Sequence, residues 1–441
     1  MEVQPNPAGG FHCETSPEIQ INLNVRGLNA SATVAINETS NELIRQGRKI
    51  YKLGLGQSPF PVPDPVVKAL QENAHQKDYL PVRGLYQLRE TIAAHHQRSF
   101  GIDCSAEDVL IGPGSKELMF LMQLVYYGEL VIPAPSWVSY KPQAQIIGRQ
   151  IRLLQTRPEN NWQITAAQLD AFCREDPHRP RLLILNYPSN PTGKSYTRDE
   201  LAELAAVARK YRILVLSDEI YGKIHHDGQH HSIVPMYPEG TVFSGGLSKW
   251  CGAGGWRLGL FVFPKCLRWL EDAMAVAASE TYTSTSAPIQ YAAVSAFQKN
   301  PEIDLYLSRV RQILKSLGNT LADHLNQAGI KTLSPDGAFY LFPDLSNFRG
   351  KLMERGINTS SQLCKKLLEE TGVAILPGSE FGLPPETLTF RLAFVNFDGS
   401  KALKALEGQS QQSLPDETFL KTCCGDTLTA VKILSDWIQS L

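Results

Sequence analysis

The feature that most constrains the fold of this chain is an alternation of short apolar, β-rich runs with amphipathic segments between about residues 105 and 265. The runs are VLIG at 109, ELVIP at 129, LLILNYP at 182, ILVLSDEIY at 213, TVFSGG at 241 and LGLFVF at 258. Each run has the length of a strand, and the segments between them leave room for helices. This alternation predicts an α/β fold in which a parallel or mixed sheet is covered by helices.

The domain organisation also follows from local patterns. The sequence TRDE at 197–200 is a capping-box pattern followed by an amphipathic segment, which predicts the start of a helix. After about residue 305, a long helix-like stretch precedes GIKTL, GAFYLF, VAILPG and LTFRLAFVNF, which indicates a smaller α+β unit. We therefore expect an N-terminal arm over 1–30, the first part of a small domain over 31–60, a large domain over 61–305 and the remainder of the small domain over 306–441.

The C-terminal region contains an interruption. Residues 408–426 are rich in Gln and Ser, and we expect them to form a surface loop. Beyond them, apolar residues at helical spacing predict a terminal helix with one buried face. These residues are Leu428, Val431, Leu434, Ile438 and Leu441.

Charge and cysteine content narrow the classes of function. The chain of 441 residues has 43 Lys and Arg against 44 Asp and Glu, and no long block of one sign, so neither a nucleic acid nor a membrane is an expected partner. Its apolar runs are far shorter than the roughly 20 residues of a membrane-spanning helix. The eight cysteines lack C-x-x-C or zinc-ligand spacing, and the N-terminus lacks a secretory signal. We expect a cytoplasmic enzyme that acts on small molecules and binds no metal.

Several familiar motifs are incomplete. TGKS at 192–195 resembles the end of a P-loop, but Pro188 stands where its first glycine should be. The segment 246–250 lacks the second glycine of a hydrolase nucleophile elbow, and GPG at 112–114 does not extend to a dinucleotide-binding fingerprint. The histidine-rich segment HHDGQHH at 225–231 spans a DG turn, so we expect a surface hairpin there in preference to a metal site.

A different set of motifs occurs in one order along the chain. It comprises DYLPVRGLYQLR at 78, GPGSKEL at 112, PAPSW at 133, NYPSNPTGK at 186, SDEIYGK at 217, SGGLSKWCGAGGWRLG at 244 and FRLAF at 390. Together these motifs closely resemble those of the class I/II aminotransferases, over about residues 50 to 400. The resemblance implies fold type I, with a mostly parallel seven-stranded sheet in the large domain, and pyridoxal 5'-phosphate as cofactor. It also implies transfer of an amino group from an L-amino acid to a 2-oxo acid by a ping-pong mechanism.

The resemblance assigns the catalytic groups. Lys249, in a Gly-rich turn after a strand, is implied to be the Schiff-base lysine and the base that moves the α-proton. Asp218 ends an apolar strand and is implied to keep the cofactor's ring nitrogen protonated, with Glu219 as the competing carboxylate. Tyr221 and Asn190 are implied to donate hydrogen bonds to the ring phenolate, although Asn190 is also typical of a turn before proline.

The remaining assignments concern the cofactor phosphate and the substrate. Backbone amides at a helix start, hydroxyls and cations suit a phosphate, and Trp137 is implied to lie against the cofactor ring unless it is a core residue. The implied phosphate ligands are Gly114, Ser115, Lys116, Ser248 and Arg257. Arg391 and the backbone of Gly56 are implied to bind the α-carboxylate. Tyr79 and the Thr285-Ser286 segment are implied to reach the neighbouring subunit, which predicts a homodimer with shared active sites.

Two features leave the substrate and the outcome of the reaction open. One aminotransferase subgroup binds a side-chain carboxylate with an arginine in the segment at 278–288, which here contains no Arg or Lys. Another uses a lysine just after the phosphate-loop glycine, where this chain has Ser115; we expect Lys116 to face elsewhere. Aminocyclopropane-carboxylate synthases and carbon–sulfur β-lyases share the motifs, so a lyase is the alternative.

A regulator with a DNA-binding domain is disfavoured, because only about 45 residues precede the family-like body.

Overall fold

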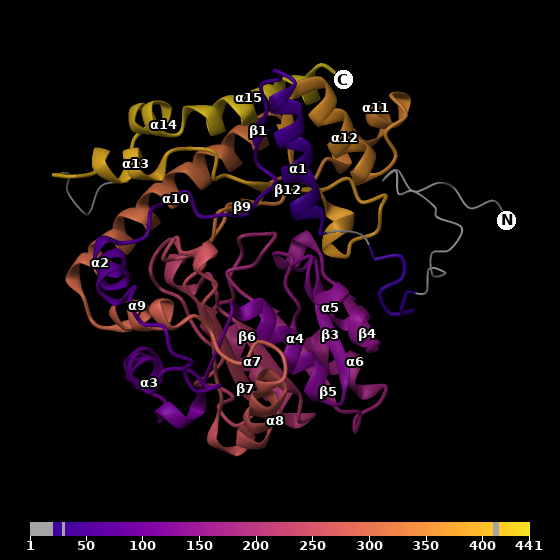
Figure 1. Cartoon of the computed structure of the whole chain (residues 1–441). Helices are drawn as coiled ribbons and strands as arrows, with labels where there is room; N and C mark the ends of the chain where they lie inside the picture. The colour runs from indigo at the N-terminus through magenta and orange to yellow at the C-terminus, as the bar shows by residue number, and fades with distance from the viewer. Residues whose placement is uncertain (1–20, 29–30, 409–413) are drawn as a thin grey trace, which may run out of the picture.

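The computed structural model describes residues 21–28, 31–408 and 414–441. Figure 1 shows a sheet with its helices below, and a second part above that combines α1 with the C-terminal helices. Most of the expected arm, residues 1–30, lies outside the described residues.

A seven-stranded sheet forms the lower part, in the order β2-β8-β7-β6-β5-β3-β4. All neighbouring strands are parallel except those that pair with β8. The strands are β2 (Val109–Gly112), β3 (Glu129–Ala134), β4 (Ile151–Gln155), β5 (Arg181–Asn186), β6 (Leu214–Asp218), β7 (Thr241–Gly246) and β8 (Gly259–Val262). The prediction of a helix-covered, mostly parallel sheet is confirmed, although the short run IRLLQ of β4 was missed.

Helices cover both faces of this sheet because successive strand residues point to opposite sides. In β5, Leu182 and Ile184 pack in the cluster that contains α4, α5 and α8, whereas Leu183 and Leu185 pack with α6 and α7. The helices of this part are α2 (Asp64–Asn73), α3 (Tyr86–Phe100), α4 (Ser115–Val125), α5 (Tyr140–Ile147), α6 (Ala166–Arg174), α7 (Arg198–Lys210), α8 (Arg268–Ser279) and α9 (Ala287–Phe297). The predicted capping box is present: Thr197 caps α7, and its side chain accepts a hydrogen bond from Glu200 N–H.

The upper part unites the two ends of the chain. Strand β1 (Tyr51–Lys52) pairs in parallel with β10 (Val373–Ala374), and β12 (Phe390–Ala393) lies between β11 (Leu376–Pro377) and β9 (Tyr340–Leu341). Its helices are α1 (Ala32–Arg45), α11 (Arg349–Glu354), α12 (Ser360–Thr371), α13 (Gly399–Ala405), α14 (Glu417–Cys423) and α15 (Gly425–Gln439). The long helix α10 (Pro301–Gln327) runs between the two parts in Figure 1. We propose domain boundaries near 60 and 305, the second of which falls in the first turns of α10.

The C-terminal interruption differs from the expectation of a loop over 408–426. Residues 417–423 form α14, because Asp416 caps its N-terminus and Leu420 and Cys423 are buried in the core. The predicted terminal helix is α15, and Val431, Leu434 and Ile438 are buried.

The histidine-rich segment 225–231 lies only partly at the surface: Asp227, Gly228, Gln229 and His231 are exposed, as expected, but other histidines of the segment are not. His226 is buried and its ring nitrogens lie 3.1 Å from the carbonyl of Pro335 and 3.0 Å from that of Ala338. His230 Nε2 lies 2.6 Å from Glu219 Oε2. The partners of His226 lie more than 100 residues later in the chain, and Glu219, the partner of His230, lies in the turn after β6. The local DG turn pattern does not reveal either contact. Among the described residues, no three His, Cys, Asp or Glu side chains are grouped to hold a metal ion.

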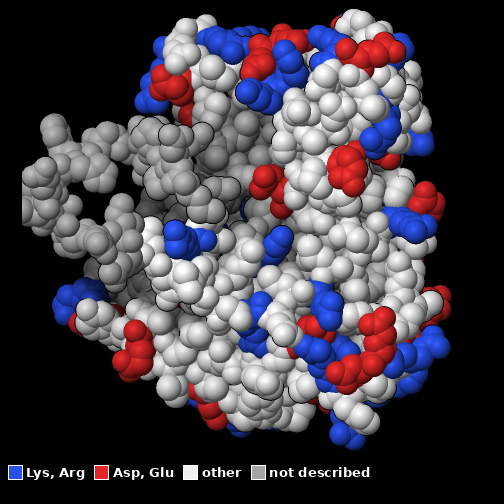
Figure 2. All heavy atoms as spheres, turned by 90° about the vertical axis from the view of Figure 1, so that its right-hand side faces the viewer, with Lys and Arg blue, Asp and Glu red and all other residues white. Residues whose placement is uncertain are grey.

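Two surface observations bear on partners. In the described part of the chain, no helix combines the length and the apolar character needed to cross a membrane. On the face shown in Figure 2, cationic and anionic side chains are interspersed, without a continuous patch of either sign.

Candidate active site

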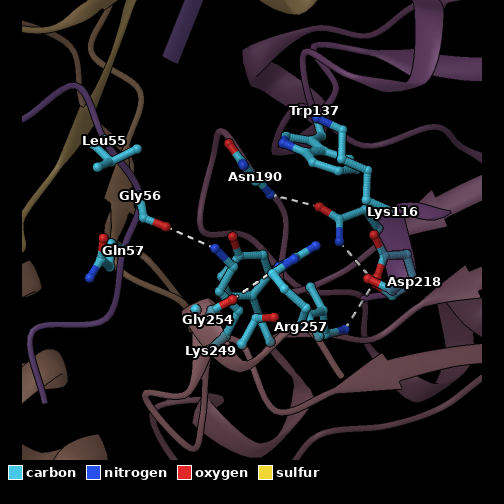
Figure 3. A pocket seen from close by; sticks show the side chains of 16 residues that line it. Leu55, Gly56, Gln57, Lys116, Trp137, Asn190, Asp218, Lys249, Gly254 and Arg257 are labelled. Atoms are coloured by element: carbon cyan, nitrogen blue, oxygen red, sulfur yellow. Dashed lines mark hydrogen bonds between the residues drawn. The ribbon is translucent and has the colours of Figure 1, made fainter. Parts of the chain in front are cut away.

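A cavity of about 280 Å³ lies at the carboxyl ends of the parallel strands, where polar loops meet residues of the upper part (Figure 3). Such an edge is the usual ligand site of an open α/β sheet. The cavity is lined by Leu55, Gly56, Gln57, Ser115, Lys116, Trp137, Asn186, Asn190, Asp218, Ile220, Tyr221, Ser248, Lys249, Gly254, Gly255 and Arg257. Most of the residues selected from the sequence therefore lie together, although they come from segments that are distant in the chain.

Lys249 occupies the turn that follows β7. Its Nζ donates a hydrogen bond to the carbonyl of Gly56, at 2.8 Å. Burial, with the nearby charges of Arg391 and Arg257, lowers the pKa of Lys249 to about 8, whereas Asp218 opposes this shift. About a tenth of the amine is therefore uncharged at pH 7, far more than for an ordinary lysine, and this fraction can act as a nucleophile or a base.

Asp218 is the last residue of β6 and is buried. Tyr140, the first residue of α5, donates a hydrogen bond from its hydroxyl to Asp218 Oδ2 at 2.5 Å. Burial raises the pKa of Asp218 to about 6, although the hydrogen bonds from Tyr140 and from the Ile220 N–H favour the charged form. The competing carboxylate, Glu219, does not line the cavity.

A cluster of anion-binding groups lies where α4 begins. Gly114 has a φ of 90° and precedes Ser115, so the backbone turns there into the helix. The positive φ at position 114 favours glycine, and a Cβ there would also displace Nη2 of Arg257. The guanidinium of Arg257 donates to the carbonyls of Gly254, at 3.0 Å, and Pro113, at 3.3 Å. Ser115, Ser248 and Arg257 thus offer hydroxyls and a fixed cation beside a helix N-terminus.

Lys116 corrects one expectation, because its side chain lines the cavity (Figure 3). Its ammonium lies 5.6 Å from the centroid of the Trp137 ring. Burial and the charge of Arg257 lower the pKa of Lys116. Lys116 therefore supplies a cation to the cavity. It stands one position after Ser115, which occupies the place of the lysine in one aminotransferase subgroup.

Arg391 lies on β12 and is almost fully buried. Its guanidinium donates to Asn190 Oδ1 at 3.0 Å and to the carbonyl of Gly54. It lies between two rings, with the carbon of the guanidinium 4.8 Å from the Tyr340 centroid and 5.1 Å from that of Phe381. Nε of Arg391 has no hydrogen-bond partner among the described residues. A buried cation in this state is suited to an incoming carboxylate.

Tyr340 is a site residue that the sequence did not reveal. Its hydroxyl lies 2.7 Å from that of Tyr221, and both side chains are buried. Burial and the proximity of Tyr340 raise the pKa of Tyr221, so its hydroxyl stays protonated and can donate. A Cβ at Gly56 would collide with the Tyr340 hydroxyl, which explains glycine at that position. Neither Tyr140 nor Tyr340 has a distinctive spacing in the sequence.

Arg391 contacts Asn190, which lines the cavity, but does not itself line it. Two further predicted regions do not join this cavity within one chain. The side chain of Tyr79 is 90% exposed. Thr285 is buried, but its hydroxyl has no hydrogen-bond partner among the described residues, and neither it nor Ser286 lines the cavity. Tyr79 and Ser286 are exposed and available for contacts outside the single chain, whereas Thr285 is buried within it.

Comparison with known proteins gives one consistent result. The family model for class I and II aminotransferases matches residues 48–407. An aspartate aminotransferase of Geobacillus stearothermophilus is 35% identical over 372 residues, which cover 82% of this chain and 91% of that protein. A probable aspartate/prephenate aminotransferase of Rhizobium leguminosarum bv. phaseoli is 32% identical, with 82% and 91% covered. The solved structure of Thermus thermophilus aspartate aminotransferase with maleate superposes with a TM-score of 0.81 and 26% identity, covering 95% of this chain and 99% of that one.

Proposed function

The chain belongs to the class I and II aminotransferases, and from this premise we propose which of its residues hold the cofactor and the substrate. The comparisons confirm the prediction of a pyridoxal-phosphate-dependent aminotransferase, and the relatives described above are all aminotransferases, not lyases. Its substrates are accordingly amino acids and 2-oxo acids.

The residues of the cavity fit pyridoxal phosphate. The groups around Arg257 and the start of α4 suit the phosphate, Asp218 suits a protonated ring nitrogen, and Lys249 supplies an amine. Trp137 lines the cavity where an aromatic ring would be covered. When bound, the cofactor supplies an aldehyde that holds an amine covalently and a ring that withdraws electrons from it.

The chain's own groups then divide the work. Lys249, once displaced by the substrate amine, removes the proton from the substrate's α-carbon, because burial leaves part of its amine uncharged. Arg391 binds the α-carboxylate, and its hydrogen bond to Asn190 orients both side chains. Because Asn190 Oδ1 accepts from Arg391, its amide NH₂ remains free to donate toward the ring phenolate. Tyr221 supplies the second donor.

The observation that carries these roles is that the buried amine of Lys249, whose pKa is lowered to about 8, and the buried carboxylate of Asp218 line the same cavity. Borohydride reduction of the purified holoenzyme should fix the cofactor on Lys249, as identified by peptide mapping. Lys249→Ala should lose the label, whereas Lys210→Ala, an exposed control, should keep it. A label on Lys116 or Lys223 would contradict the assignment.

We further propose that the substrates include dicarboxylic amino acids. Lys116 places a cation in the cavity that can bind a side-chain carboxylate, in place of the arginine missing from residues 278–288. The names of the relatives support this choice. Lys116→Met should lower kcat/KM for aspartate by about tenfold or more while alanine changes little, with Lys210→Met as the control. An equal loss for both donors would instead indicate a role at the phosphate.

We propose a homodimer with shared sites, because Tyr79 extends into solvent from its own chain. Mixing inactive Lys249→Ala chains with inactive Tyr79→Phe chains should restore one intact site per hybrid. A monomer that is fully active, as shown by sedimentation at the assay concentration, would exclude shared sites.

The free thiols among the described cysteines support the further proposal of a reducing, cytoplasmic setting.

A further inference from the structure

A second cavity, of about 310 Å³, adjoins the first. Its walls come from α3, from the turn after β6, and from β7, α9 and α10. Ile220 is the one described residue that lines both cavities. The second cavity is therefore distinct from the first, and the segment around Ile220 forms part of the wall between them.

Neighbouring residues of the same turns face different cavities. Asp218 and Tyr221 line the first cavity, whereas Glu219 and Lys223, from the same turn, line the second. On the neighbouring turn, Lys249 lines the first cavity and the next residue, Trp250, lines the second. A ligand in the second cavity would thus contact the backbone segments that carry both catalytic groups.

Lys223 is an unsatisfied cation in this cavity. Its Nζ lies 4.1 Å from the centroid of the Trp250 ring and 5.2 Å from that of Phe297. No described residue accepts a hydrogen bond from this ammonium or forms an ion pair with it. Burial, the largest cause, lowers the pKa of Lys223 to about 8. A partly desolvated ammonium that contacts only ring faces has strong capacity left for an anion.

The carboxylates of the cavity do not fill this role. Glu219 already accepts hydrogen bonds from Ser217, at 2.7 Å, and Ser232, at 2.5 Å, and contacts His230. Asp304 is exposed and forms no ion pair with a described residue, although its charge raises the pKa of both Lys223 and Arg311. Arg311 adds a second cation beside Lys223, to whose carbonyl its Nε donates at 2.9 Å.

These features define the chemistry of a ligand. The rings of Trp250, Phe297 and Phe243 offer apolar walls, and Lys223 with Arg311 offers a site for one carboxylate. A second carboxylate would face repulsion from Glu219 and Asp304. We propose that this cavity binds a small aromatic monocarboxylate, and that its occupancy alters the cofactor site through the shared wall.

The test uses the holoenzyme and para-fluorophenylacetate, followed by fluorine NMR, with saturating maleate to fill the active site. We expect a bound signal that maleate does not displace. Lys223→Met should weaken this binding by about tenfold or more, because a charge-assisted hydrogen bond is lost. The control Lys315→Met, which removes an amine paired with Asp227 outside the cavity, should bind as the wild type does. Binding that is wholly displaced by maleate, or unchanged in Lys223→Met, would overturn the proposal.

Two further readouts test the coupling and guard against misfolding. In the maleate-saturated enzyme, the probe should shift the absorption spectrum of the bound cofactor, and Lys223→Met should abolish the shift. Tight binding without a spectral change would overturn the coupling. If the variant does not fold, wild-type protein decides the question, because the probe should slow reductive methylation of Lys223, measured by peptide mass, but not that of Lys315. Equal rates with and without the probe would overturn the proposed contact.

Discussion

Removal of one hydroxyl, by Tyr140→Phe, should change how cofactor affinity depends on pH. The Tyr140 hydroxyl donates to Asp218 Oδ2 at 2.5 Å in a buried setting, and the phenylalanine ring would keep the edge-to-face contact with Trp137, whose centroid lies 5.2 Å away. The substitution therefore removes a hydrogen bond to the charged carboxylate and preserves the packing. Such a bond contributes about 1.5–3 kcal/mol.

The size of the effect follows from linkage. At 1.36 kcal/mol per pKa unit, the loss moves the pKa of Asp218 from about 6 to about 7–8 in the apoprotein. In its proposed role, Asp218 must be charged to bind the protonated ring of the cofactor. A higher pKa of Asp218 in the apoprotein then weakens cofactor binding at every pH at which this carboxyl is protonated. The ratio of variant to wild-type Kd should approach about 10–100 below pH 6 and fall toward one above about pH 9.

The assay is titration of apoprotein with pyridoxal phosphate from pH 5 to 9, followed by cofactor absorption. The ratio of the two Kd values cancels titrations that both proteins share, such as those of the phosphate and Lys249. Tyr211→Phe is the matched control, because it removes a hydrogen bond to Asp170 outside the cavity, at 2.9 Å. A ratio that is constant across this pH range would refute the reasoning, since Tyr140 would then act only through packing.

Three further outcomes are expected. Arg391→Lys should lower kcat/KM about 10–100-fold for every amino donor alike, because an ammonium cannot form two parallel bonds to the α-carboxylate; a loss confined to aspartate and glutamate would contradict this. Gly56→Ala should destabilise the protein to chemical unfolding by about 1–3 kcal/mol through collision with Tyr340, whereas Gly255→Ala, which meets no atom within 4 Å, should not. Burial raises the pKa of Glu271 to about 7, so the folded state holds the proton more tightly. The contribution of Glu271 to stability should then be full below about pH 4.5 and lost as pH rises through 7, by about 3 kcal/mol at about 1.36 kcal/mol per pKa unit; an unchanged pH slope in Glu271→Gln would exclude this group.

The sequence predicted the parts of the site that depend on local chain geometry. Asp218 ends an apolar strand and Lys249 lies in the turn after another, so a place near the sheet edge could be predicted from the strand pattern, whereas their roles were implied only by the resemblance. Tyr140 and Tyr340 could not be found in this way, because each is an aromatic residue in a segment where aromatic residues are ordinarily core. The expectation that Lys116 faces elsewhere was wrong, because its side chain lines the cavity near Trp137, and a sequence motif does not specify this direction.

The charges around the cavity explain why cofactor and substrate bind in the same place. Four cations, Lys116, Lys249, Arg257 and Arg391, surround or line it, and Asp218 is the carboxylate that faces them. Their mutual repulsion is visible in the pKa of Lys249, which Arg391 and Arg257 both lower. A phosphate with a charge of about −1.5 to −2 removes much of the excess, and a substrate carboxylate removes another unit. In the roles proposed above, the cofactor and then the α-carboxylate at Arg391 would offset this excess of positive charge in turn.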